Sequence, residues 1–166
     1  MLSVTEGGET SSVIGTIMAA LRQYGEDPTG ASEKLYFIYN NPSEVLMPFE
    51  RSRMVIENPH ITKIQLWTGP QSIGGSTRMQ ASTSEQFVIS ILLEEALIRS
   101  LQRVLNLAEM EQMGFSEAIV KLSLQERLES FLAIQASVAA AAKDVSRFTD
   151  LEATIYAEKK HSFYFA

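Results

Sequence analysis

Cysteine is absent from this chain of 166 residues, and histidine occurs only twice. The lack of thiols excludes disulfides, thiol catalysis and zinc–thiolate sites within the chain. His60 and His161 lie far apart in the sequence, so we expect a surface or structural role for each, in place of metal binding or base catalysis. We therefore predict no metal site, no cofactor and no catalytic residue.

Long apolar runs and an excess of positive charge are also missing. No uninterrupted apolar stretch is long enough to cross a bilayer. The net charge of −6 disfavours general binding to nucleic acid or to anionic membranes. The composition, with 45% hydrophobic and 20% charged residues, is typical of a soluble globular chain with a core. We expect a cytoplasmic protein, or a nuclear one in a eukaryotic cell, with no membrane or nucleic-acid partner.

What the sequence does contain is an alternation of short strand patterns and longer helix patterns. Strand patterns occupy residues 2–4, 35–39 and 61–67, and a helical pattern follows each of them. Strands that alternate with helices are typical of a parallel sheet with helices on its faces. The predicted fold class is therefore α/β, with a parallel sheet flanked by helices and a helical segment after it.

Local details of these elements are also predicted. Ser11 or Ser12 is the expected N-cap of the first helix, since serine hydroxyls accept hydrogen bonds from free helix amides. A patchy apolar stripe predicts a helix over residues 45–56, with its proline near the first turn. Phe37 and Trp67 stand inside predicted strands, so both are expected in the core.

The second half of the chain has a helical character throughout. A wide apolar stripe that starts near residue 82 predicts one long helix, and Gly114 marks a break after it. Further helices are predicted over residues 119–124 and 128–138. The charged residues of these helices are interpreted as solvated faces.

Two polar loops that contain glycine follow the first and the third predicted strands, over residues 5–12 and 73–83. The carboxyl ends of parallel strands meet at one edge of a sheet, and ligands of such sheets bind at that edge. We therefore expect the two loops to lie on the same side of the molecule.

The second loop has the chemistry of an anion site. Gly74 and Gly75 allow a tight turn and a close approach of the backbone to a ligand. The helix that follows offers free amides to negative charge. Ser76 and Thr77 add hydroxyl donors, and Arg78 can hold a carboxylate or a phosphate through two parallel hydrogen bonds. The alternative interpretation of this stretch is an ordinary loop with an N-cap.

A longer stretch around this loop resembles a known family. Residues 69–83 read Gly-Pro-Gln-Ser-Ile-Gly-Gly-Ser-Thr-Arg-Met-Gln-Ala-Ser-Thr. This resembles the motif of the sugar isomerase (SIS) domain superfamily, in the group that contains the N-acetylmuramic acid 6-phosphate etherases and the glucokinase regulatory protein. That motif runs Gly-Pro/Ala-Glu, a short apolar stretch, and then Gly-Ser-Ser/Thr-Arg-Met/Leu-Lys-Ala/Gly-Gly-Thr/Ser-Ala. The chain departs from it at Gln71, Gln80, Ser82 and Ser84.

The resemblance implies a layout for the whole chain. Residues 1–108 are expected to form the C-terminal half of an SIS-type αβα sandwich, of which the chain holds the second half only. Residues 109–158 are expected to form a helical linker segment. Residues 159–166 resemble the opening strand of a second SIS domain, which is the layout of the glucokinase regulatory protein.

The resemblance also implies a phosphosugar-binding site at the two loops. The residues carried over are Thr5, Gly7, Gly8 and Thr10 from the first loop, with Ser76, Thr77 and Arg78 from the second. Glu9 stands where the etherases have an arginine, so it is expected to weaken phosphate binding. Glu6 and Glu9 stay open to two interpretations, an acid–base or sugar-binding role and simple exposed loop acids.

The function implied is that of a phosphosugar-binding protein of the glucokinase regulatory protein type. Such a protein binds a sugar phosphate and regulates a partner protein, for example a sugar kinase. One alternative is an N-acetylmuramic acid 6-phosphate etherase, a carbon–oxygen lyase, and another is a degenerate SIS-like module that binds nothing. The expected ligand is a hexose 6-phosphate or N-acetylmuramic acid 6-phosphate. Self-association is expected as well, because half of a domain leaves sheet edges uncovered.

Overall fold

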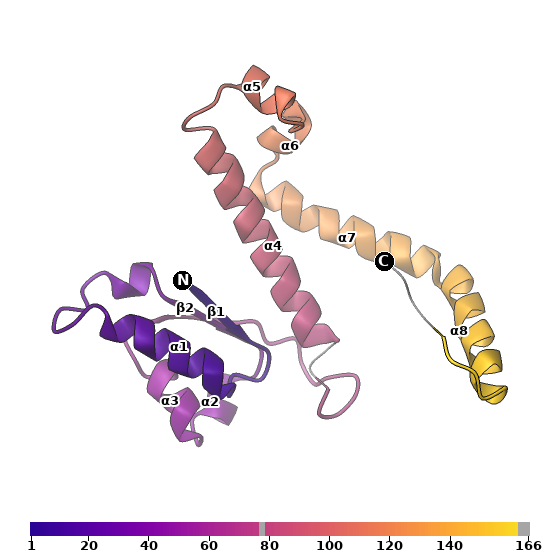
Figure 1. Cartoon of the computed structure of the whole chain (residues 1–166), viewed down its shortest axis with the longest axis horizontal. Helices are drawn as coiled ribbons and strands as arrows, with labels where there is room; N and C mark the ends of the chain where they lie inside the picture. Colours follow the sequence, from indigo (N-terminus) through magenta and orange to yellow (C-terminus); the bar gives the residue numbers. More distant parts are fainter. Residues whose placement is uncertain (77–78, 163–166) are drawn as a thin grey trace. The chain divides into compact units, whose positions relative to one another are not determined.

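The structure is a computed structural model that describes residues 1–76 and 79–162. Contacts between Cα atoms divide the chain into two compact units, Met1–Leu93 and Glu94–Ala166. Figure 1 follows the chain from the strands of the first unit to the helices of the second. Within the described ranges, no helix is long and apolar enough to cross a membrane.

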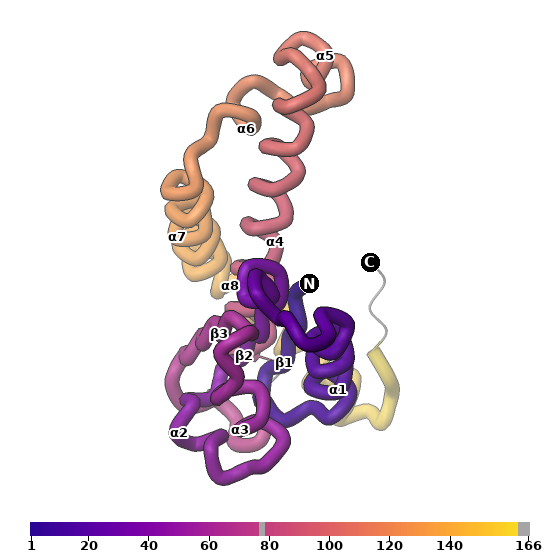
Figure 2. The backbone as a smooth tube through the Cα atoms, turned by 90° about the vertical axis from the view of Figure 1, so that its left-hand side faces the viewer, coloured from indigo at the N-terminus to yellow at the C-terminus, as the bar shows by residue number. Residues whose placement is uncertain are grey.

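The first unit is built on a parallel sheet, as the alternating pattern predicts. Its described strands are β1 (Leu2–Thr5), β2 (Tyr36–Tyr39) and β3 (Thr62–Gln65), in the spatial order β1-β2-β3. Leu2 pairs with Tyr36, and Tyr36 pairs in turn with Thr62, so the three strands start level with one another. Figure 2 shows them side by side, with β2 in the middle. The coarse α/β prediction is confirmed.

Helices lie on both faces of this sheet. One face packs on α1 (Ser11–Arg22) and α3 (Glu50–Ile56), with a 3-10 turn at Ala31–Glu33 and the short α2 (Ser43–Leu46) nearby. Successive side chains of a strand point to opposite faces. Tyr39 packs in the core with α1, whereas the side chain of Asn40, one residue later, reaches α4 (Gln80–Leu101). The start of α4 therefore covers the other face.

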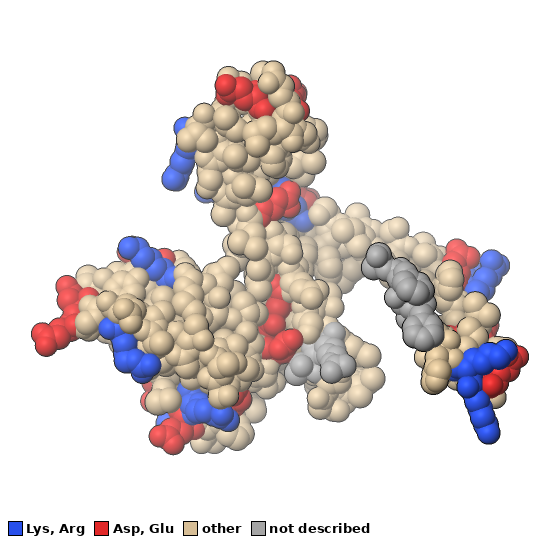
Figure 3. Space-filling view, in the orientation of Figure 1, with Lys and Arg blue, Asp and Glu red and all other residues tan. Residues whose placement is uncertain are grey.

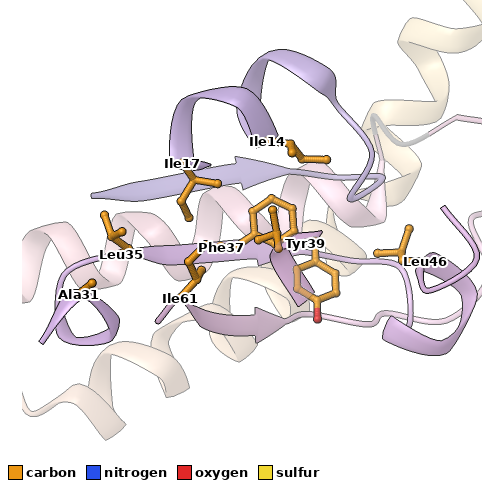
Figure 4. Packing of buried hydrophobic residues seen from close by; sticks show 9 residues of the cluster. Ile14, Ile17, Ala31, Leu35, Phe37, Tyr39, Leu46 and Ile61 are labelled. Atoms are coloured by element: carbon orange, nitrogen blue, oxygen red, sulfur yellow. The ribbon is translucent and has the colours of Figure 1, made fainter. Parts of the chain in front are cut away.

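The core of the first unit lies between the sheet and α1 (Figure 4). Phe37 and Tyr39 are fully buried, and their ring centroids lie 5.2 Å apart with the planes tilted by 34°. Side chains from α1, α2, α3, the 3-10 turn and the residues just before β2 and β3 complete the cluster. They are Ile14, Ile17, Ala31, Leu35, Leu46, Val55 and Ile61.

Three local predictions for the first unit are wrong. Trp67 is 61% exposed, because β3 ends at Gln65, two residues before it. The helix predicted over residues 45–56 is two helices, α2 and α3, and Pro48 stands between them because proline cannot continue a helix. The N-cap of α1 is Thr10, and its side chain makes no capping hydrogen bond.

The described helices of the second unit are short or exposed. They are the end of α4, α5 (Leu107–Gln112), α6 (Glu117–Lys121), α7 (Leu124–Ala140) and α8 (Ala142–Ala157). A small core of Ile98, Met110 and Val120 joins the first three. Gly114, with φ +94°, makes the predicted break between α5 and α6. The helical character predicted for this region is confirmed.

Half of the predicted terminal strand, residues 163–166, lies outside the described residues. Residues 159–162 are described and are not a strand. Residues 163–166 lie outside the described part, so the opening strand of a second domain stays a prediction, as do the predicted domain boundaries.

Arg127 is a buried charged residue that connects helices of the second unit. It lies on α7 with only 3% of its side chain exposed, and it forms ion pairs with Glu94 and Glu95 of α4. Its Nη2 also donates to the carbonyl oxygen of Ile119, the third residue of α6, at 2.8 Å. One side chain therefore connects three helices.

Candidate functional site

The loop after β1 is the first part of the predicted site, and it is held by its own hydrogen bonds. The Gly8 amide donates to the Thr5 carbonyl oxygen at 3.3 Å. The hydroxyls of Thr5 and Thr10 hydrogen-bond each other at 2.7 Å. Asn41, two residues past β2, donates from its side chain to the Gly7 carbonyl oxygen at 2.9 Å. These hydrogen bonds fix the shape of the loop, in which Thr5 is buried and Thr10 is exposed.

Gly8 is the position in this loop where a side chain is not tolerated. Its φ is +79°, and a Cβ atom there would lie 2.4 Å from Cδ1 of the buried Leu46. A side chain at Gly7 would meet nothing within 4 Å. Gly8 is therefore needed for packing, while Gly7 is the glycine that leaves open space beside the loop.

Glu9 turns its carboxylate toward α3. It accepts a hydrogen bond from the Ser52 amide at 2.9 Å, contacts the Ser52 hydroxyl, and pairs with Arg51 at 3.0 Å. Burial alone would raise the pKa of Glu9, but these Ser52 and Arg51 contacts together hold the pKa below its usual value. Free amides in the first turn of a helix favour negative charge. The charge expected to repel a phosphate is thus engaged with the first turn of α3.

The loop between β3 and α4 is held by Gln80, the first residue of α4. Its Oε1 accepts hydrogen bonds from the amide and hydroxyl of Ser72 at 2.7 and 2.8 Å. Its Nε2 donates to the carbonyl oxygens of Thr68 and Pro70 at 3.4 and 3.3 Å. Gln80 therefore fixes this loop to the helix.

The turn of the same loop is made by its glycines. The Ser76 amide donates to the Ile73 carbonyl oxygen at 3.0 Å, and Gly75 has φ +77°. Such a φ favours glycine because it is strained for other residues. Ser76 is left half-buried at the end of this turn.

A polar cluster joins the first loop, the end of β2 and the start of α4. Ser82 on α4 donates to Glu6 Oε1 at 3.0 Å, which links α4 to the loop after β1. Asn40 is buried and donates to Glu85 Oε1 at 2.8 Å and to the Ala81 carbonyl oxygen at 3.3 Å. Ser84 donates to Asn40 Oδ1 at 3.1 Å. Both ends of the Asn40 amide are therefore satisfied inside the protein.

Glu85 carries the most perturbed carboxyl group of the site. It is buried, with 4% of the residue exposed. Burial is the main cause that raises the pKa of Glu85, the Asn40 hydrogen bond lowers it, and the negative charge of Glu6 raises it, so that the pKa lies at about 7. A carboxyl group with such a pKa changes its charge near neutral pH.

The predicted site residues fall into three groups in the structure. Thr5 ends β1, Gly7, Gly8 and Thr10 lie in the loop that follows it, and Ser76 lies in the loop before α4. Thr77 and Arg78 lie outside the described residues. Because β2 separates β1 from β3, the two loops leave the sheet about 10 Å apart at the same edge.

Asn40 and Glu85 were not predicted from the sequence. A signal for Glu85 was present, since it follows Ala81 by one helical turn and thus shares its face. A carboxylate on the face that α4 turns to the sheet needs a partner. That partner, Asn40, stands 45 residues earlier in the chain, beyond the reach of local patterns.

The surface of the described residues carries charged side chains of both signs. On the face shown in Figure 3, lysines and arginines are interspersed with acidic side chains. In residues 1–76 and 79–162, no three histidine, aspartate or glutamate side chains are grouped so that they could hold a metal ion.

Comparison of the chain with protein-family models, with curated proteins and with solved structures found no significant match.

Proposed function

We propose that the carboxyl edge of the first unit binds a sugar phosphate, as part of an SIS-type phosphosugar-binding protein that regulates a partner. In this proposal residues 1–108 form the C-terminal half of an SIS-type sandwich. The single observation that carries it is the contact of Ser82 with Glu6, because it ties the start of α4 to the loop after β1. The two loops that resemble the family motif are thereby held at one sheet edge.

The chemistry available at this edge suits a phosphorylated sugar. Glycine turns, hydroxyls and free amides at the start of α4 suit a phosphate, and the sequence adds Arg78. Glu6, Asn41 and Thr10 lie on the same edge and can hydrogen-bond sugar hydroxyls. The partner proposed is a protein such as a sugar kinase, and the ligand a hexose 6-phosphate.

A second candidate function is the etherase reaction on N-acetylmuramic acid 6-phosphate. The observation that favours it is Glu85, a carboxyl group whose raised pKa of about 7 suits proton transfer at neutral pH. The degenerate module is favoured by the Thr5–Thr10 hydrogen bond, which uses two of the hydroxyls proposed for the ligand.

The test is a calorimetric titration of the full-length protein with fructose 6-phosphate, N-acetylmuramic acid 6-phosphate and inorganic phosphate. Binding of fructose 6-phosphate is expected, and Arg78→Ala is expected to weaken it by about tenfold or more, since a charge-assisted hydrogen bond contributes roughly 1.5–3 kcal/mol. Arg103→Ala, a matched change in the second unit, is the control and leaves binding unchanged.

The other results of the titration distinguish the alternatives. Release of lactate from N-acetylmuramic acid 6-phosphate identifies the etherase. Binding that Arg78→Ala leaves intact overturns the site assignment. No binding of any ligand at millimolar concentration identifies the degenerate module.

A further inference from the structure

Glu85 is placed where it can control the predicted ligand loop. It lies in the second turn of α4 and, with Asn40, fixes that helix to the end of β2. Gln80, the first residue of the same helix, holds Ser72, Thr68 and Pro70 of the preceding loop through four hydrogen bonds. A displacement of the start of α4 is therefore passed directly to this loop.

The surroundings of Glu85 make its charge unfavourable. Among the described residues, Glu6 is the charged group that faces it, from the loop after β1. The end of β2 contributes the neutral Asn40, and α4 itself contributes the hydroxyls of Ser82 and Ser84. Burial and the nearby charge of Glu6 are the causes that raise the pKa of Glu85.

We propose that Glu85 is a positioning residue whose protonation holds α4 against β2 and keeps the loop before α4 in its ligand-binding shape. Loss of the proton places a buried negative charge beside the partly buried carboxylate of Glu6. The repulsion between these two carboxylates is then relieved by movement of the first turns of α4 away from the sheet, which distorts the loop that Gln80 fixes. Ligand affinity falls as the pH rises. This inference rests on the proposed function of the same edge.

The experiment compares wild type with Glu85→Gln, which mimics the protonated carboxyl group. Dissociation constants for fructose 6-phosphate are measured from pH 5.5 to 8.5 by calorimetry. The fluorescence of Trp67, the only tryptophan of the chain and one that lies just past β3, gives a second readout of the loop. The ratio of the two constants is used at each pH, because the ionisation of the ligand itself cancels in it.

At pH 5.5 the dissociation constant of wild type is expected to equal that of Glu85→Gln. At pH 8 the dissociation constant of wild type is expected to be up to about tenfold larger, because one proton is linked to binding. Glu57→Gln, a change at an exposed glutamate of the same unit, serves as control and gives a ratio near one throughout. Glu6→Gln provides a second test if Glu85→Gln does not fold. It removes the facing charge and shifts the midpoint of the affinity loss to lower pH.

A ratio that stays flat while the ligand binds overturns this inference and leaves the proposed function intact. A midpoint that Glu6→Gln does not move also overturns it. Absence of binding at every pH overturns the proposed function, and this inference with it.

Discussion

Gly7 and Gly8 are neighbours in the loop after β1, yet only Gly8 is confined by its surroundings. We expect Gly8→Ala to lower the free energy of unfolding by about 2 kcal/mol, because its Cβ atom would collide with Leu46 and its φ is positive. Gly7→Ala, with nothing within 4 Å of the new atom, is the matched control and costs less than about 1 kcal/mol. Urea unfolding of both variants measures the difference, and equal losses would contradict the structure of this loop.

The second residue-scale prediction concerns the pH dependence of stability at Glu85. A carboxyl group whose pKa is raised in the folded state stabilises the protein below its unfolded pKa of about 4.5, and this stabilisation is lost as the pH rises through about 7. Between pH 5 and pH 8.5, the free energy of unfolding of Glu85→Gln is therefore expected to rise by about 2 kcal/mol relative to that of wild type.

Thermal unfolding of both proteins across this pH range, without ligand, measures that gain. A constant difference between the two proteins would show that Glu85 does not titrate in the folded state near neutral pH.

At the scale of helices, the buried Arg127 allows a prediction for the stability of the second unit. Replacing it by methionine keeps the bulk of the side chain but leaves Glu94 and Glu95 without their common partner. Glu94 is about half exposed, so water reduces the free-energy cost of leaving its carboxylate without a partner. We expect the second unit to lose about 2 kcal/mol of stability.

The control for this element-scale prediction is Lys121→Ala, which breaks an exposed ion pair with Glu117 inside α6. Such pairs contribute about 0.5 kcal/mol or less. Loss of helical circular dichroism on heating compares the two variants. An Arg127→Met protein as stable as Lys121→Ala would show that this ion-pair cluster does not hold the helices together.

Element identity could be predicted from the sequence where the pattern is local. Alternation and periodicity located the strands and the long helix, and glycine at 114 located the break. Element ends were less predictable, because the end of β3 at Gln65, which leaves Trp67 exposed, depends on pairing with Tyr39 of β2. In the candidate site, too, local features could be predicted from the sequence and long-range contacts could not. The parallel topology predicted that both loops share an edge, but the Asn40–Glu85 contact joins distant positions and could not be predicted from either one.

For the whole molecule, we expect self-association. β1 and β3 each have one unpaired edge among the described residues, and such edges associate with other chains. Several large apolar side chains of α7 and α8 are exposed as well. They are Leu132, Ile134, Val138, Val145, Phe148, Leu151 and Tyr156.

Sedimentation velocity over a range of concentrations tests this expectation. The double variant Leu132→Ser with Phe148→Ser is expected to associate less than wild type, whereas Thr149→Ser is expected to behave as wild type. A clean wild-type monomer at high concentration would contradict the prediction.

The most direct test of sugar phosphate binding at the carboxyl edge of the sheet is a nuclear magnetic resonance titration of the isotope-labelled protein with fructose 6-phosphate. We expect the backbone amide signals of residues 5–10 and 72–85 to shift together with one dissociation constant. The signals of α6 and α7, in the second unit, are expected to stay in place. Shifts centred on the second unit, or no shifts at saturating ligand, would contradict the proposed site.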